Sequence, residues 1–215
     1  MILHKTEPVA VLIAGPMRAG KSTAASVLMD KYGIPKVSLA DKLKELHSTV
    51  TGSLEKDREW LQVNGQAHRA VFGGDFWVKA LTDSIRKSGY ESWCVDDVRY
   101  PNEMYGLYEF AKSMGMKVVM VYVKASMDTQ IERGAEINLL GHESEDMSRL
   151  IGNSVRLVGC REVANLDQLP LLVLDGNLNL RDFAVQAVES IPVRVKEMYT
   201  LDDIQCIAEQ VSADG

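Results

Sequence analysis

The stretch IAGPMRAGKST, from Ile13 to Thr23, decides the fold because it lies between an apolar segment and a helical pattern. Its spacing of glycine, four residues, glycine, lysine and serine is typical of a phosphate-binding loop. The segment before it, PVAVLIAG, predicts a buried strand, and the segment after it, KSTAASVLMDKYG, predicts a helix that ends at Gly33. A strand, a glycine-rich loop and a helix in this order favour a nucleotide-phosphate site over a glycine-rich turn with a solvated lysine.

Individual residues of this loop have separate expected roles. Gly15 and Gly20 allow the backbone to wrap, so that its N–H groups and the helix N-terminus face phosphate oxygens. Lys21 is expected to reach the β- and γ-phosphates, and the Ser22 hydroxyl to bind Mg²⁺. Arg18 either points to solvent or lies over the transferred phosphoryl group.

Apolar segments of strand length alternate with helical patterns along the chain, without repeats or a low-complexity linker. The expected strands are 8–15, 36–40, 92–98, 117–123 and 169–175, and the expected sheet-packing helices are 21–33, 101–115 and 180–191. This order predicts an α/β fold in three layers, with a five-stranded parallel sheet in the middle.

Two stretches interrupt the alternation. We expect one domain, 1–215, whose core comprises about 8–40, 90–123 and 168–192, with a helical insertion at about 41–89 and a polar one at about 124–161. Insertions at the carboxyl edge of a parallel sheet are where ligands bind. In the tail, 193–215, Thr200 and Asp203 fit a capping box on a short helix, for which we assign no function.

Composition limits the classes of function. The net charge of −6 over 215 residues argues against broad DNA binding and leaves room for a local basic pocket. No apolar run is long enough to cross a membrane and no leader pattern precedes the first strand, so we expect a cytosolic protein that does not bind membranes. Cys94, Cys160 and Cys206 lack metal-ligand spacing and are expected to be reduced and buried.

A polar stripe marks the first insertion. Arg58, Gln62, Gly65 and Arg69 follow one another at steps of four, three and four residues and share a helix face. Two arginines beside a glycine indicate a face turned toward an anionic substrate, and the alternative is a solvated face with a packing glycine. Trp77 follows at helical spacing, either as a core residue or as a platform for a base.

The third expected strand ends in VDDVRYPNE. Asp96 and Asp97 are placed to hold Mg²⁺ directly or through water, and Arg99 to bind a phosphoryl group with two hydrogen bonds. The alternative is a structural network of ion pairs. Because a phosphate-binding loop needs a metal partner nearby in the sheet, we favour the functional interpretation and name Asp97 with Ser22 as the metal ligands.

The second insertion contributes Arg133, which is expected to fold over the phosphates and neutralise charge in the transition state, although a surface position is the common alternative. His142 is more typical of a hydrogen-bonded structural histidine than of a catalytic base. A phosphate acceptor is already anionic near neutral pH, so its attack needs no general base.

Several motifs occur in one order along residues 9–190. They are GPMRAGKST, SLADKLKE, REWLQVNG, FWVKAL, DDVRYPNE, GHESE and LLVLDGNLNL. This ordered set resembles the bacteriophage deoxynucleoside monophosphate kinases, which have the nucleoside monophosphate kinase fold of the P-loop NTPase superfamily. The resemblance implies that the first insertion binds the monophosphate and that the second is a lid.

The resemblance also implies the substrates and their sites. Mg·ATP would be the donor and a deoxynucleoside 5′-monophosphate the acceptor, so the partners are small nucleotides and the location is the cytoplasm, that of the host if the protein is phage-encoded. Residues that would bind the donor and metal are Gly15, Ala19, Gly20, Lys21, Ser22 and Thr23, with Asp175 and Asn177 near the adenine. Residues that would bind the acceptor are Ala40, Asp41, Lys44, Arg58, Gln62, Arg69, Trp77 and Arg99. His142 and Glu145 match a lid motif without an assigned role.

The sequence leaves other functions open. The acceptor is alternatively another phosphorylated metabolite, such as dephospho-coenzyme A, or a modified base in DNA, and a third interpretation is an ATP-hydrolysing switch without an acceptor. The accepted base, selectivity against ribose and the choice between monomer and homodimer are also open. In the leading hypothesis Lys21, Arg99 and Arg133 take part in phosphoryl transfer, and Arg18 is the alternative source of positive charge.

Overall fold

A central sheet of five parallel strands organises the protein. The computed structural model describes residues 8–55, 57–135 and 171–190. The strands are β1 (Val9–Ala14), β2 (Lys36–Val37), β3 (Trp93–Val98), β4 (Lys117–Lys124) and β5 (Leu171–Asp175), in the spatial order β2-β3-β1-β4-β5. Every neighbouring pair is parallel, so the predicted three-layer α/β fold with a five-stranded parallel sheet is confirmed.

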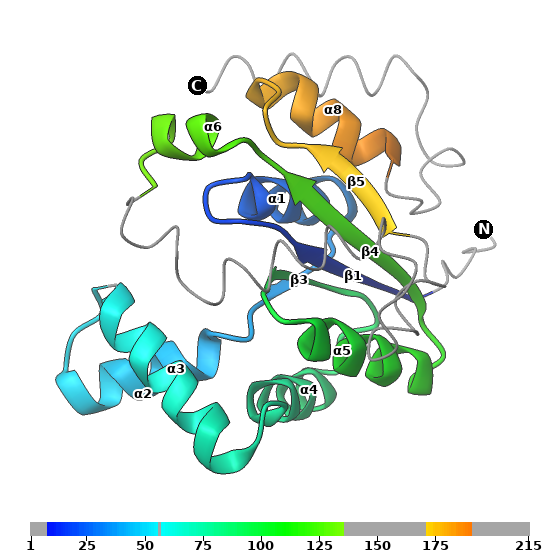
Figure 1. The fold of residues 1–215 in the computed structure, drawn as a ribbon. Coiled ribbons are helices and arrows are strands. Elements are labelled where there is room, and N and C mark those ends of the chain that lie inside the picture. Colours follow the sequence, from blue (N-terminus) through cyan, green and yellow to red (C-terminus); the bar gives the residue numbers. More distant parts are fainter. Residues whose placement is uncertain (1–7, 56, 136–170, 191–215) are drawn as a thin grey trace, which may run out of the picture.

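Helices cover both faces of the sheet, as Figure 1 shows. On one face lie α1 (Lys21–Tyr32) and α8 (Leu180–Ser190), which pack against Val11 and Ile13 of β1. On the other lie α4 (Phe76–Ser88) and α5 (Pro101–Ser113), which pack against Ala10 and Leu12. Because both faces are covered, β1 is buried at every position and reads as a continuous apolar run.

The first insertion places two helices beyond the carboxyl ends of the strands (Figure 1). These are α2 (Asp41–Thr51) and α3 (Arg58–Phe72). Asp57 caps α3 by accepting a hydrogen bond from the Trp60 N–H, and Gly73 ends it. A short helix after β4, α6 (Met127–Glu132), begins at the second insertion.

The second strand is shorter than predicted. The sequence predicts 36–40, whereas β2 contains only Lys36 and Val37. The next three residues turn toward a neighbouring strand end, where the backbone N–H groups of Leu39 and Ala40 donate to the Asp97 carboxylate instead of a sheet partner.

Several predictions fall outside the described residues. They concern most of the lid with His142 and Glu145, the tail with Thr200 and Asp203, and Cys160 and Cys206. Cys94 is buried in β3 as a free thiol whose pKa burial raises, so it is an unreactive core residue, as predicted. Among the described residues no helix has the length and apolar character needed to cross a membrane.

Candidate active site

A cleft of about 840 Å³ opens at the carboxyl edge of the sheet. Its walls come from the loop between β1 and α1, the loop between β2 and α2, α3, the start of α4, the end of β3, the residue that follows α6 and the loop between β5 and α8. Of the predicted site residues, those that line it are Arg18, Ala19, Gly20, Lys21, Ser22, Thr23, Ala40, Asp41, Lys44, Arg58, Gln62, Arg69, Trp77, Asp97, Arg99 and Arg133. The fold thus brings expected donor and acceptor residues into one cavity. Gly15, Asp175 and Asn177 do not line it.

The loop between β1 and α1 has the backbone of a phosphate cradle. Gly15 has φ 145° and Gly20 has φ 107°, and Arg18 is the one non-glycine described residue with positive φ, at 59°. A Cβ on Gly15 would lie 2.4 Å from the Val123 carbonyl oxygen, so only glycine fits between the loop and β4. Positive φ angles at three positions curve the loop sharply, and a loop of this kind can turn several N–H groups toward an anion.

Lys21 begins α1 and is only 8% exposed. Its ammonium donates hydrogen bonds to the Gly15 and Pro16 carbonyl oxygens, at 2.7 and 2.6 Å. These carbonyls hold the ammonium across the mouth of the loop, beside the first turn of α1, whose backbone N–H groups have no carbonyl partner within the helix. The Ser22 side chain, next in the helix, lies exposed in the same cleft.

The side of the cleft that holds the predicted donor residues (the donor side) is braced by the end of α6 and the loop after β5. Arg133 donates to the carbonyl oxygens of Arg18 and Leu178, at 3.3 and 3.2 Å, and so joins the phosphate loop to the β5–α8 loop. The Asn177 side-chain oxygen accepts the Ser126 N–H at the start of α6. Arg133 is therefore engaged with backbone carbonyls, and Asn177 shapes the loop instead of facing the cavity.

We predict that Gly176→Ala disrupts this side of the cleft. A Cβ on Gly176 would lie 2.3 Å from the Ala19 carbonyl oxygen and 3.0 Å from that of Lys124, so backbone must shift. The free energy of unfolding should fall by about 2 kcal/mol, as for other overpacked sites, and ATP should bind more weakly. Chemical denaturation and ATP titration measure the two effects. Wild-type stability together with wild-type ATP affinity would contradict this account of the loop.

Two adjacent carboxylates at the end of β3 have different partners. The pairing of β1 with β3 shifts register between Leu12 and Ala14, and such an irregularity re-aims side chains. Asp97 accepts hydrogen bonds from the Ser38 hydroxyl at 2.6 Å and from two backbone N–H groups of the β2–α2 loop. Burial raises the pKa of the Asp97 carboxyl, and the Ser38 hydrogen bond opposes that rise.

Asp96 lies in the same cleft and is 6% exposed. Its ion pair with the half-exposed Lys36 has an N–O distance of 3.5 Å. Because Asp97 already accepts from three donors, the arrangement favours Asp96 as the carboxylate available to a cation. No group of three or more potential metal-ligating side chains occurs in the described ranges, so a cation here would need ligands from water or substrate as well.

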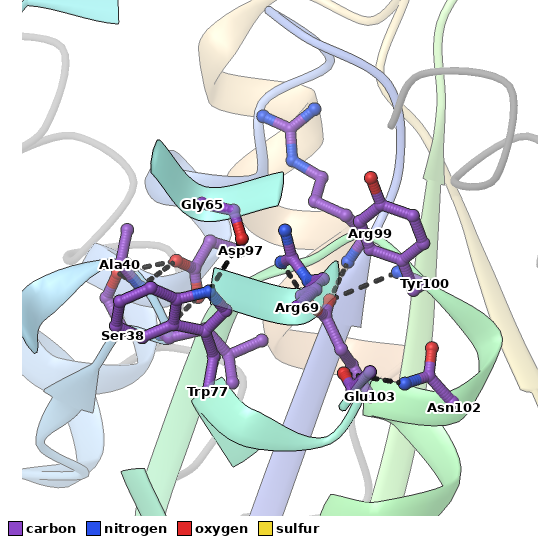
Figure 2. A network of polar contacts seen from close by, with 12 residues as sticks. Ser38, Ala40, Gly65, Arg69, Trp77, Asp97, Arg99, Tyr100, Asn102 and Glu103 are labelled. Atoms are coloured by element: carbon purple, nitrogen blue, oxygen red, sulfur yellow. Dashed lines mark hydrogen bonds and ion pairs between the residues drawn. The ribbon is translucent and has the colours of Figure 1, made fainter. Parts of the chain in front are cut away.

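The side of the cleft that holds the predicted acceptor residues (the acceptor side) is built around a buried carboxylate, shown in Figure 2. Arg69 of α3 donates from Nη2 to Glu103 Oε1 at 2.6 Å, and its guanidinium lies over the Tyr100 ring, 4.5 Å from the ring centre. Glu103 Oε2 accepts the Arg99 N–H at 2.9 Å. Burial raises the pKa of Glu103, and the charge of Arg69 opposes this rise. In Figure 2 the Arg99 side chain extends away from Glu103.

The polar residues and the glycine of the stripe on α3 have different surroundings. Arg58 donates a weak hydrogen bond from Nη1 to the Met17 sulfur at 3.2 Å, so the first turn of α3 touches the phosphate loop, and Gln62 lines the cleft. Gly65, by contrast, packs against α2, because a Cβ there would lie 3.3 Å from a Leu43 methyl group. The glycine therefore serves helix packing, while its polar neighbours face the cavity.

Trp77 is a core residue at the edge of the cleft. It is 4% exposed, and its indole N–H donates to the Gly65 carbonyl oxygen at 3.1 Å, which ties α4 to α3. Its ring packs with Phe76 and His68. At the other end of the acceptor side, Lys44 and Asp41 form an exposed ion pair at 2.9 Å.

Ser38 and Tyr100 were absent from the predicted site. Ser38 joins the β2–α2 loop to Asp97, and Tyr100 supports Arg69. The signals were faint: a serine after a short strand, and an aromatic residue between an arginine and a proline. Both become recognisable only when segments distant in sequence are brought together.

Similarity to known proteins is found among solved structures. No family model matches the chain, and no curated protein matches it. Among solved structures, an unliganded sugar kinase from Janibacter sp. HTCC2649 is similar, with TM-score 0.48 and 16% identity over 87% of this chain and 95% of that one. A candidate kinase from Chloroflexus aurantiacus j-10-fl has TM-score 0.47 and 18% identity over 86% and 99%. At these values the similarity does not identify the substrate of this chain.

Proposed function

We propose that this protein transfers the γ-phosphoryl group of ATP to the phosphate of a deoxynucleoside 5′-monophosphate. The observation that carries the proposal is that the phosphate loop and the arginines of α3 and the β3–α5 loop line one cleft. A switch or simple ATPase needs the loop alone, whereas a second basic wall opposite it suits an anionic acceptor. The choice of a deoxynucleotide rests on the ordered motifs that resemble the phage kinases.

In this proposal the chain positions two phosphates for in-line displacement. The bond between the γ-phosphorus and the oxygen bridging to the β-phosphate breaks, a bond to an oxygen of the acceptor phosphate forms, and ADP leaves with the electron pair. The loop N–H groups and Lys21 stabilise the negative charge of the donor, while Arg99 and Arg69 hold the acceptor. No side chain has to remove a proton, because the acceptor oxygen is already ionised.

For Arg133 we propose a role different from the one that the sequence predicts. Its hydrogen bonds to Arg18 and Leu178 brace the donor side, so we propose that it shapes the ATP site. Arg18, exposed at the tip of the loop, is then the better placed source of positive charge over the transferred group.

The oxygen donors in the cleft fit Mg²⁺, since Ser22 supplies a hydroxyl and the end of β3 a buried carboxylate. When bound, Mg²⁺ would neutralise charge on the donor phosphates. Ser22 with Asp96 would hold it directly or through water, and the predicted Asp97 is the alternative.

Two isosteric substitutions separate the roles of these aspartates. Asp96→Asn should raise the Mg²⁺ concentration for half-maximal activity by on the order of tenfold. Asp97→Asn should instead lower the free energy of unfolding by about 2 kcal/mol, because its amide places a donor against the donors of the β2–α2 loop. Magnesium titration and chemical denaturation of both variants test this. If the Mg²⁺ concentration for half-maximal activity rises in the Asp97 variant alone, Asp97 and not Asp96 is the metal ligand.

The proposed function is tested by ADP release from Mg·ATP with a panel of acceptors. The panel holds the four common deoxynucleoside monophosphates, their ribose counterparts, dephospho-coenzyme A and a DNA oligonucleotide. We expect stimulation by at least one deoxynucleotide. Stimulation only by dephospho-coenzyme A or by DNA would show that this molecule, and not a deoxynucleotide, is the acceptor. A low rate of ADP release that no acceptor changes would favour an ATPase or switch.

A further inference from the structure

Glu103 is a buried acidic residue that the phosphoryl-transfer chemistry does not itself require. It is fully buried in α5, at the floor of the acceptor side of the cleft. Oε1 pairs with Arg69 Nη2 at 2.6 Å, and Oε2 accepts the backbone N–H groups of Arg99 and Tyr100 at 2.9 and 3.1 Å. A buried carboxylate is costly unless it is paired, and these three donors pair it from two separate segments.

The geometry of Arg69 suggests what this pairing achieves. Glu103 holds one edge of the guanidinium and the Tyr100 ring lies against one face, 4.5 Å from the guanidinium carbon to the ring centre. The Arg69 side chain is still 22% exposed, and its buried Nε has no hydrogen-bond partner among the described residues. A guanidinium has five N–H donors, so donors remain for a ligand in a fork whose orientation is already fixed.

Resting on the function proposed above, we infer that Glu103 is a positioning residue for the acceptor phosphate. One carboxylate sets the Arg69 guanidinium, carried by α3, relative to the backbone that carries Arg99. The Arg69 guanidinium and the Arg99 backbone then stand at a fixed spacing before the ligand arrives, which removes part of the ordering cost of binding. Glu103 acts through these arginines and needs no contact with the substrate.

The test compares Glu103→Gln and Glu103→Asp with Glu109→Gln, the same change at an exposed position of the same helix. Glutamine has one acceptor oxygen, so either Arg69 or the two backbone N–H groups lose their partner. We expect the acceptor KM of Glu103→Gln to rise on the order of tenfold to a hundredfold, with the ATP KM unchanged. Glu103→Asp keeps the charge, so its acceptor KM should lie between those of the wild type and Glu103→Gln. The acceptor KM of Glu109→Gln should equal that of the wild type.

Two readouts do not depend on turnover. Calorimetric titration with a deoxynucleoside monophosphate, without ATP, should show weaker binding to Glu103→Gln, and the Arg99 and Tyr100 amides should exchange faster with solvent while β1 amides do not. If the wild type binds the monophosphate but transfers no phosphate, the proposed function is contradicted. The comparison of monophosphate affinities would then still test the role of Glu103. Equal monophosphate affinities in the wild type and both Glu103 variants, or no binding to the wild type, would overturn the inference. If Glu103→Gln does not fold, the same comparison is made with Glu103→Asp.

Discussion

Lys21→Ala is expected to lower phosphoryl transfer at least on the order of a thousandfold while the fold is retained. Lys21 is the one buried lysine among the described residues. Its ammonium lies across the mouth of the phosphate loop and donates hydrogen bonds to two carbonyl oxygens. Its removal takes away the positive charge that would follow the γ-phosphoryl group into the transition state. Steady-state turnover with saturating ATP and acceptor measures the loss.

The fold should survive this change because the glycines and the β4 contact, not the ammonium, shape the loop. Circular dichroism and thermal unfolding check that point. Lys31→Ala, in the last turn of the same helix, removes an identical side chain outside the cleft and should leave turnover unchanged. Near-normal turnover in Lys21→Ala would exclude this loop as the donor site.

Arg99→Ala is expected to raise the acceptor KM on the order of a hundredfold, equivalent to about 3 kcal/mol, with little change in the ATP KM. The backbone of Arg99 is fixed by Glu103, and its side chain reaches along the cleft away from that carboxylate (Figure 2). The guanidinium of an arginine with a fixed backbone can bind a phosphate through two parallel hydrogen bonds, which lysine does not reproduce. Arg99→Lys should therefore recover only part of the loss.

The control for Arg99 is Arg86→Ala, since Arg86 is an exposed arginine of α4 that does not line the cleft. Acceptor and donor saturation curves of the three variants separate the two sites. An unchanged acceptor KM in Arg99→Ala would remove Arg99 from the acceptor site, and an equal rise in both Michaelis constants would point to a general structural defect.

Local sequence patterns predicted the strands and helices that depend mainly on residues close together in the sequence. The strand before Gly15, the helix after it and β4, which is apolar between its two terminal lysines, follow from period and capping, and the structure contains all three. β2 is shorter than predicted because the backbone after it forms hydrogen bonds with Asp97, almost sixty positions away, instead of with a neighbouring strand. A local sequence pattern cannot predict which distant residue will accept these hydrogen bonds.

The candidate site shows the same limit. The stripe on α3 and the end of β3 were recognised as separate groups, and helical spacing alone left Gly65 open between ligand contact and packing. The different partners of Asp96 and Asp97, and the register shift beside them, cannot be predicted from the two letters DD. The pairing of Arg69 with Glu103, 34 residues apart, likewise appears only after α3 and α5 are folded against the same sheet edge.

The central claim is tested most directly by following the γ-phosphate itself. The protein is incubated with Mg²⁺, γ-labelled ATP and one deoxynucleoside monophosphate, and the nucleotides are separated by chromatography. The account predicts label in a deoxynucleoside diphosphate, equal in amount to the ADP formed and absent when Lys21→Ala replaces the wild type. Label that appears only as inorganic phosphate, whatever monophosphate from the acceptor panel is added, would contradict it.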